Sequence, residues 1–175
     1  ISLLNFLKLK VDPSLSVNKI IGVKEIKDYL DQKIDLNQVQ LAIVKENQDI
    51  IDYWCSEPDN GIADALNKGV ARSRGEYIAF LHADDYFLDE FSTKRALGSL
   101  EKSTDLIAFD IFFETQGGRR RGASRGFNFY TNFKMPFYHP GVLCKRSLFD
   151  RLGGFESHFK IAMDYDVFLR ASGVR

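Results

Sequence analysis

The chain has 175 residues, of which 45% are hydrophobic and 27% are charged, the balance of an ordinary soluble globular protein. This length is enough for one domain with a sizeable core and too short for two comfortable ones. The 24 Lys and Arg residues equal the 24 Asp and Glu residues in number, so no overall field favours nucleic acid or an acidic membrane. No stretch approaches the about 18 apolar residues that a membrane span needs.

The two cysteines, Cys55 and Cys144, are far apart and lack the spacing of a metal site. Both lie in apolar runs, which predicts small buried side chains in a reducing compartment. The short apolar opening has no cleavage site, so it makes a poor signal peptide. Because the chain begins without Met and stops within a predicted helix, we expect a single domain, residues 1–175, that is incomplete at both ends.

The first third of the chain predicts a βαβ unit, with a strand at residues 20–23, a helix at 24–33 and a strand at 39–45. Residues 50–55 predict a further strand, which the turn-forming residues 56–61 end.

The best-defined element is a helix that begins at Ile62. Its small and apolar residues recur at the spacing of one helical face: Ile62, Ala65, Leu66, Gly69 and Val70. Asp59 or Asn60 is predicted to cap its start, and Gly75 follows its end.

The rest of the chain continues to alternate strands and helices. We expect, in chain order, a strand at 77–81, a helix at 89–102, a strand at 105–113, a mobile Gly/Arg-rich loop at 114–125, a strand at 142–145, a short helix from Ser147, a turn at Gly153 and Gly154, and a helix from about Tyr165. This order implies an α/β fold with a mainly parallel sheet flanked by helices. Ligands of such sheets bind beyond the carboxyl ends of the strands.

An acidic pair, Asp84 and Asp85, lies at such a strand end. Adjacent carboxylates repel and raise each other's pKa unless a cation is near. Oxygen ligands at this place suit Mg²⁺ or Mn²⁺, which would in turn hold a diphosphate. A solvated turn explains the same pair, because Asp is common in turns, and on these two residues alone that interpretation is favoured.

Two separated blocks of sequence give further evidence on the function of the acidic pair. The first comprises SEPDNGIADALNKGV at residues 56–70 and GEYIAFLHADD at residues 75–85. The second comprises HPG at residues 139–141, Arg146 and Phe149, GGFE at residues 153–156 and IAMDYDVFLR at residues 161–170. Their order and separation closely resemble those of bacterial family 2 glycosyltransferases. The resemblance implies a GT-A fold, the Rossmann-like fold of nucleotide-diphospho-sugar transferases.

The resemblance also implies roles for single residues near the acidic pair. Asp84 takes the position of the metal ligand on the donor diphosphate, with Asp85 as a second ligand or its neighbour. His82 stands where the family has its first acidic residue, and a neutral imidazole there can still donate to a phosphate or ribose.

Asp164 occupies the position of the family's catalytic base, which must lie near the acceptor hydroxyl on the sugar face opposite the leaving diphosphate. Without the resemblance, helix N-capping by Asp164 is the better interpretation, and both roles are compatible. Asp166 is expected to be a supporting or acceptor-side carboxylate.

Four further residues are assigned to donor binding by the resemblance: Asp59, Asn67, Lys68 and His139. For Lys68, offsetting the diphosphate charge and lying on a solvated helix face are equally good interpretations. For His139, a ligand contact and a hydrogen bond that orders its loop are equally good.

Arg119, Arg120 and Arg121, with Arg125, form the one basic cluster, and a solvated loop is favoured over a nucleic-acid or lipid-head-group patch. The family's first two strand motifs, which contact the nucleotide base and ribose, are not visible in residues 20–23 or 39–45. Donor identity therefore does not carry over.

The predicted function is a metal-dependent, inverting glycosyl transfer from a UDP- or GDP-sugar, with Mg²⁺ or Mn²⁺, to a glycan or lipid-linked acceptor in cell-surface polysaccharide biosynthesis. The resemblance places it in the cytoplasm, with peripheral association at the inner membrane face as an open option. Two rivals are weighed: a catalytically silent GT-A-like binding or scaffold domain, which the missing N-terminal motifs favour, and a nucleic-acid-binding domain, which the zero net charge disfavours.

Overall fold

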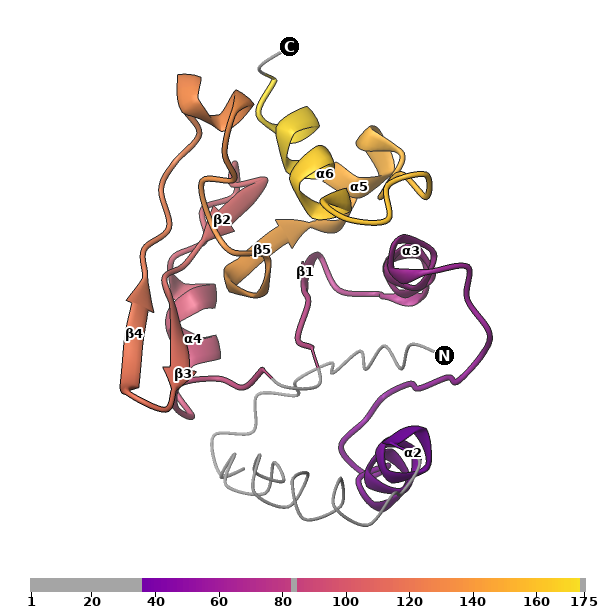
Figure 1. The fold of residues 1–175 in the computed structure, drawn as a ribbon. Helices are drawn as coiled ribbons and strands as arrows, with labels where there is room; N and C mark the ends of the chain where they lie inside the picture. The colour runs from indigo at the N-terminus through magenta and orange to yellow at the C-terminus, as the bar shows by residue number, and fades with distance from the viewer. Residues whose placement is uncertain (1–35, 83–84, 174–175) are drawn as a thin grey trace. The chain divides into compact units, whose positions relative to one another are not determined.

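The computed structural model of the chain describes residues 36–82 and 85–173. The predicted strand at 20–23 and helix at 24–33 lie outside these residues, and so does Asp84. The described residues divide into two compact units, one formed by residues 36–58, 81–82 and 85–99 and the other by residues 59–80 and 100–173. We call them the first and the second unit (Figure 1).

The described part of the first unit contains helix α2, Leu36–Glu46. This corrects the strand predicted at 39–45. The apolar run at 41–44 is too short for its periodicity to distinguish a strand from a helix. In the structure it is part of the longer helix α2. Asn47 follows the end of this helix and donates its side-chain amide to Ile43 O at 2.8 Å.

Residues 50–55 form no strand, only an isolated bridge at Tyr53, so that prediction was also wrong. Ile50 and Tyr53 are each 47% exposed, and a run that buries neither face gains little from pairing as a strand.

Helix α4, Ser92–Gly98, is shorter than the helix predicted at 89–102. Asp89 precedes it and accepts hydrogen bonds from Phe91 N at 2.9 Å and Ser92 Oγ at 3.1 Å. No residue of α4 is buried, so packing does not extend it.

Among the described residues, no helix has the length and apolar character needed to cross a membrane.

The second unit opens with helix α3, Ile62–Arg72, which confirms the predicted helix. Ala65, Leu66, Gly69 and Val70 are buried as the period predicted, while Ile62 is 53% exposed. The capping prediction was wrong, because Gly61 holds the N-cap position and no side chain caps the helix. Asp59 instead accepts a hydrogen bond from Gly61 N at 2.9 Å.

Gly61 has φ 115° and ψ 175°, a backbone conformation that side chains with a Cβ rarely adopt. Gly61→Ala should therefore lower the free energy of unfolding by about 1–3 kcal/mol. No atom lies within 4 Å of the place that the new Cβ would take, so the loss would come from backbone strain alone. Gly98→Ala is the matched control: it also has open space and ends a helix, so it should be neutral or stabilising. Chemical denaturation of both variants measures the difference, and equal effects would contradict the prediction.

A three-stranded sheet forms the centre of the second unit, in the order β1, Tyr77–Ala79; β5, Val142–Lys145; β2, Leu106–Ala108. Its registers pair Ile78 with Cys144 and Ile107 with Leu143, both antiparallel. The mainly parallel sheet is therefore not what the described strands form. A strand runs parallel to its neighbour only when a crossover connection, usually a helix, joins the two. Between β2 and β5 the chain forms the β3–β4 hairpin and two short 3-10 helices instead, and β5 runs antiparallel to β2.

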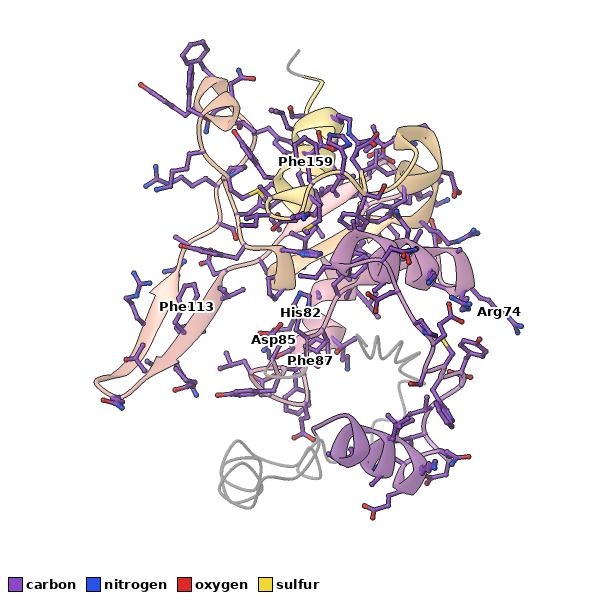
Figure 2. The ribbon with its side chains drawn as sticks, turned by 45° about the vertical axis from the view of Figure 1, so that its right-hand side comes forward. Arg74, His82, Asp85, Phe87, Phe113 and Phe159 are labelled. Carbon is purple, nitrogen blue, oxygen red and sulfur yellow. The ribbon has the colours of Figure 1, made fainter. Side chains whose placement is uncertain are left out.

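The loop predicted at 114–125 is in fact half of a hairpin, made by β3, Ile111–Thr115, and β4, Gly118–Gly122 (Figure 1). The strand predicted at 105–113 is correspondingly split into β2 and β3. Arg120 lies over the Phe113 ring at 5.0 Å from its centroid, and Figure 2 labels Phe113 on this hairpin.

Opposite charges across the hairpin explain why an arginine-rich segment forms a strand. Glu114 lies opposite Arg119 and pairs with it at 2.6 Å. Arg121 pairs with Asp110, and the Ser124 N–H followed by the Arg121 guanidinium lower the pKa of Asp110. Such cross-strand pairs stabilise a sheet, and they are not visible in the composition of one strand.

The C-terminal part of the unit confirms the remaining elements. The 3-10 helices η2, Phe129–Asn132, and η3, His139–Gly141, precede β5. Helix α5, Arg146–Leu152, follows it, and helix α6, Met163–Ala171, begins two residues before the predicted start.

Phenylalanine rings form the core of the second unit. Phe80, at the end of β1, packs on Phe149 of α5 and on Phe155, with ring centroids 5.8 and 5.5 Å apart, and Phe137 packs on Phe168 of α6 at 5.1 Å. Cys144 is 2% exposed as predicted, and burial raises the pKa of its thiol to about 12. Cys55 is only half-buried.

Candidate functional site

The turn that follows β1 carries the first candidate residues. His82 N–H donates to Asp85 Oδ2 at 3.2 Å, and Asp85 N–H donates to His82 O at 3.0 Å. Figure 2 labels both side chains in this turn, which belongs to the first unit. The two bonds fix a tight turn, and β1 ends at Ala79, three residues before His82.

The chemistry of this donor set fits a divalent cation with incomplete protein coordination. No cluster of three His, Cys, Asp or Glu side chains occurs in the part of the chain that the structure describes, and Asp84 lies outside that part. Mg²⁺ is typically held by one or two carboxylates together with substrate phosphates rather than by a cage of protein ligands. Asp84 and Asp85 would supply those carboxylates.

The first turns of α3 and the residues before it hold the candidate donor residues Asp59 and Lys68. Lys68 Nζ pairs with Asp64 Oδ2 at 2.9 Å, one helical turn away. The Asn60 N–H, followed by Lys68, lowers the pKa of Asp64. The Lys68 side chain is 31% exposed, so its ammonium lies on a helix face reached by solvent while it is held by Asp64.

The structure places Asn67, a predicted donor-binding residue, in contact with the protein backbone. Its Nδ2 donates to Phe155 O and its Oδ1 accepts from Phe155 N, both at 2.8 Å. One amide side chain on α3 thus satisfies both polar backbone groups of a residue in the turn between α5 and α6. We call this contact the Asn67–Phe155 clamp. A Cβ added at Gly154 would lie 2.5 Å from Asn67 Oδ1, so Gly154 is required for the close approach.

His139 is 8% exposed and lies among aromatic rings. Its ring centroid is 4.8 Å from that of Phe80, 5.8 Å from Phe168 and 6.1 Å from Phe155. Its position in η3, directly before β5, places it in the core of the second unit. These contacts place the imidazole in an aromatic cluster of the core, and both a ligand contact and a hydrogen bond that orders the loop stay predictions.

Asp164 lies in the first turn of α6 and is half-buried. It does not cap the helix, because Ala162 holds the N-cap position without a side-chain bond. Its Oδ1 accepts a hydrogen bond from Tyr165 N at 2.8 Å. Ala162 has φ 65°, and it is the one residue other than Gly with positive φ among those that the structure describes. Backbone strain of this kind clusters at functional sites.

Asp166 forms an ion pair with Arg170, which the sequence analysis did not predict. Arg170 donates to Asp166 Oδ2 through Nε at 2.9 Å and Nη2 at 2.8 Å, and it also donates to Gly154 O at 2.7 Å and to Leu152 O. The Asp166 and Arg170 side chains are 19% and 11% exposed. The spacing of an Asp and an Arg four residues apart predicts the pair itself, but not its contacts with the preceding turn.

The second unit therefore brings several candidates together through one turn. Asn67 of α3, His139 of η3 and Arg170 of α6 all contact residues 154–155, and Asp164 lies on the same helix as Arg170. His82 and Asp85 belong to the first unit.

Comparison with known proteins identifies the family. The family model described as glycosyl transferase family 2 matches residues 35–163. An uncharacterized glycosyltransferase of Mycobacterium tuberculosis (strain CDC 1551 / Oshkosh) is 31% identical over 124 residues, which cover 69% of this chain and 47% of that protein. A PGL/p-HBAD biosynthesis glycosyltransferase of Mycobacterium bovis (strain BCG / Pasteur 1173P2) is 28% identical over 116 residues, 65% of this chain and 44% of that protein. The aligned part thus spans less than half the length of these relatives and covers most of this chain. The chain belongs to glycosyl transferase family 2.

Proposed function

We propose that the protein is an inverting glycosyltransferase of the GT-A type, which moves a sugar from a nucleotide-sugar to an acceptor hydroxyl. The observation that supports it best, beyond family membership, is the contrast between the two carboxylates of α6. Asp166 is held by Arg170 through two contacts in a mostly buried pair. Asp164 is half-buried and accepts a hydrogen bond from a backbone N–H. A carboxylate in that position can accept a proton.

In the proposed reaction, Asp164 takes the proton of the acceptor hydroxyl. The acceptor oxygen forms a bond to the anomeric carbon from the face opposite the diphosphate. The bond between that carbon and the diphosphate oxygen breaks, and the nucleoside diphosphate leaves with the electron pair. The configuration at the anomeric carbon is inverted by this single displacement, and the product is a glycoside.

On the donor side, we assign Asp84 and Asp85 to Mg²⁺ or Mn²⁺. When bound, such a cation offsets the negative charge of the departing diphosphate. We assign Asp59, Lys68 and His82 to donor binding, with Lys68 offsetting diphosphate charge. Asn67 and His139 contribute indirectly, because they contact the backbone and the rings of the protein core.

One relative's name indicates the kind of pathway in which it acts. One of them is named for PGL/p-HBAD biosynthesis. We propose that this chain acts in cell-surface polysaccharide biosynthesis, with a UDP- or GDP-sugar as donor and a glycan or lipid-linked acceptor, at the cytoplasmic side of the membrane.

The donor proposal is tested by calorimetry of UDP, GDP and a panel of their sugars, with Mn²⁺ and with EDTA. Removing the metal should weaken nucleoside diphosphate binding by about tenfold or more, or about 1.4 kcal/mol, because two carboxylates hold the cation well only when phosphate oxygens complete its shell. Asp84→Asn should remove this metal dependence and Asp85→Asn should reduce it.

Asp150→Asn, a change at an exposed residue of α5, is the matched control and should leave the metal dependence intact. Nucleotide binding that is equally tight in EDTA would overturn the metal assignment. Absence of binding by any nucleotide-sugar would favour a catalytically silent binding domain.

A further inference from the structure

Residues 125–136, which we call the 125–136 loop, follow β4 in the second unit (Figure 1, orange). Arg125 N–H donates to Pro136 O at 2.8 Å and so joins the two ends of the loop. Inside it, Asn128 Oδ1 accepts from Tyr130 N at 2.8 Å, and Thr131 Oγ1 accepts from Asn128 N at 2.9 Å. These bonds fix the backbone of η2.

The loop is also tied to α6. Thr131 is 1% exposed, and its carbonyl oxygen accepts a hydrogen bond from the Tyr165 hydroxyl. Tyr165 is the neighbour of Asp164. The anchor is therefore buried, while the rest of η2 faces outward on a backbone that these bonds hold in place.

Three aromatic side chains project from this fixed backbone. Phe129 is 71% exposed, and Tyr130 and Phe133 are each 73% exposed, in contrast to the core residue Phe137 at 3%. The Phe129 ring lies 5.9 Å from that of Tyr130 and 5.7 Å from that of Phe133. Contiguous exposed apolar groups of this kind mark interaction sites.

The loop itself carries only positive charge. Arg125 and Lys134, both exposed, are the charged residues of the loop. No Asp or Glu occurs anywhere from residue 116 to residue 149. In the adjoining hairpin, two of the three arginines have acidic partners: Arg119 pairs with Glu114 and Arg121 pairs with Asp110. The loop therefore presents aromatic rings between two cations, with no acidic residue in its own sequence.

We propose that the 125–136 loop docks the protein onto the surface of an anionic lipid bilayer. The Tyr130 ring with its polar hydroxyl suits the head-group region. The apolar Phe129 and Phe133 rings suit the boundary between the head groups and the acyl chains. Neighbouring Lys and Arg side chains are attracted to anionic lipids. Docking through this loop would bring α6, and with it Asp164, toward an acceptor carried in the membrane; only this last consequence rests on the proposed function.

The test is co-sedimentation of the full chain with vesicles of phosphatidylcholine alone and with vesicles containing phosphatidylglycerol. The wild type should bind the anionic vesicles, and bind the neutral ones much more weakly. Phe129→Ser combined with Phe133→Ser should weaken binding to anionic vesicles by roughly tenfold or more, because the variant lacks the two apolar rings that would enter the boundary between head groups and acyl chains. Arg125→Gln combined with Lys134→Gln should weaken it by about fivefold for each cation removed.

Matched controls lie elsewhere on the chain. Phe91→Ser removes a ring that is 55% exposed, and Arg74→Gln combined with Lys94→Gln removes two exposed cations; both should bind as the wild type does. Melting curves confirm that each variant is folded. Equal binding by the loop variants and the wild type, or no binding by the wild type, would overturn the inference. Light scattering that shows a dimer lost in the Phe129→Ser, Phe133→Ser variant would assign the loop to self-association instead.

Discussion

Replacing Asp164 by Asn is expected to lower kcat by about 10²–10⁴ while donor affinity stays nearly unchanged. Asn keeps the size of the side chain and an oxygen that can accept the Tyr165 N–H, but it cannot take a proton from the acceptor. The melting temperature should change little, because Asp164 does not cap α6 and its bond is to a neighbouring N–H. The measurement is kcat beside thermal unfolding, with the donor identified by calorimetry.

Asp166→Asn provides the contrast on the same helix. It weakens the pair with Arg170, so it should lower the melting temperature more than Asp164→Asn does, and its effect on kcat should follow from that instability. If Asp164→Asn leaves kcat unchanged while Asp166→Asn abolishes turnover in a folded protein, the base is Asp166. Parallel losses of rate and melting temperature in Asp164→Asn would make Asp164 a structural residue.

Replacing Arg170 by Met is expected to lower the free energy of unfolding by about 3–5 kcal/mol, because it leaves a mostly buried carboxylate without its cation. The same change removes the donors to Gly154 O and Leu152 O, and buried acceptors without partners are costly. Arg170→Lys keeps the charge but lacks the planar fork that reaches the carboxylate and both carbonyls. Its loss should therefore be intermediate.

Arg95→Met is the matched control for this prediction. Arg95 pairs with Asp89 at 2.8 Å, but the two side chains are 57% and 42% exposed, so the change should cost about 0–1 kcal/mol. Urea denaturation of both variants measures the difference. A double-mutant cycle of Arg170→Met with Asp166→Asn should show strong coupling, and additive effects would contradict a direct ion pair between the two side chains.

The sequence predicted those elements whose pattern of apolar residues is contained within the element itself. Helix α3 follows from its helical spacing, and β5 matches the predicted residues 142–145, a short run that Pro140 and Gly141 precede. The family resemblance was confirmed by the match over residues 35–163.

The failures depend on interactions between distant residues. The hairpin of β3 and β4 needs the pairing of Glu114 with Arg119, and the antiparallel direction of the sheet depends on how β5 returns between β1 and β2. In the site, the residues at positions 67 and 155 are 88 positions apart. No local pattern could show that the amide of Asn67 binds the Phe155 backbone.

The Asn67–Phe155 clamp has a consequence for how the sequence can vary. Gly154 is constrained twice, by its φ of 75° and by the 2.5 Å between a Cβ there and Asn67 Oδ1. A smaller residue at position 67 would relieve the second constraint but leave the first, and it would deprive Phe155 of both backbone partners. Compensating exchange between the two positions is therefore blocked. Substitution at either position should lower stability, and no single change at the other position should restore it. We therefore expect Asn67 and Gly154 to be retained together, or replaced only when the whole turn changes.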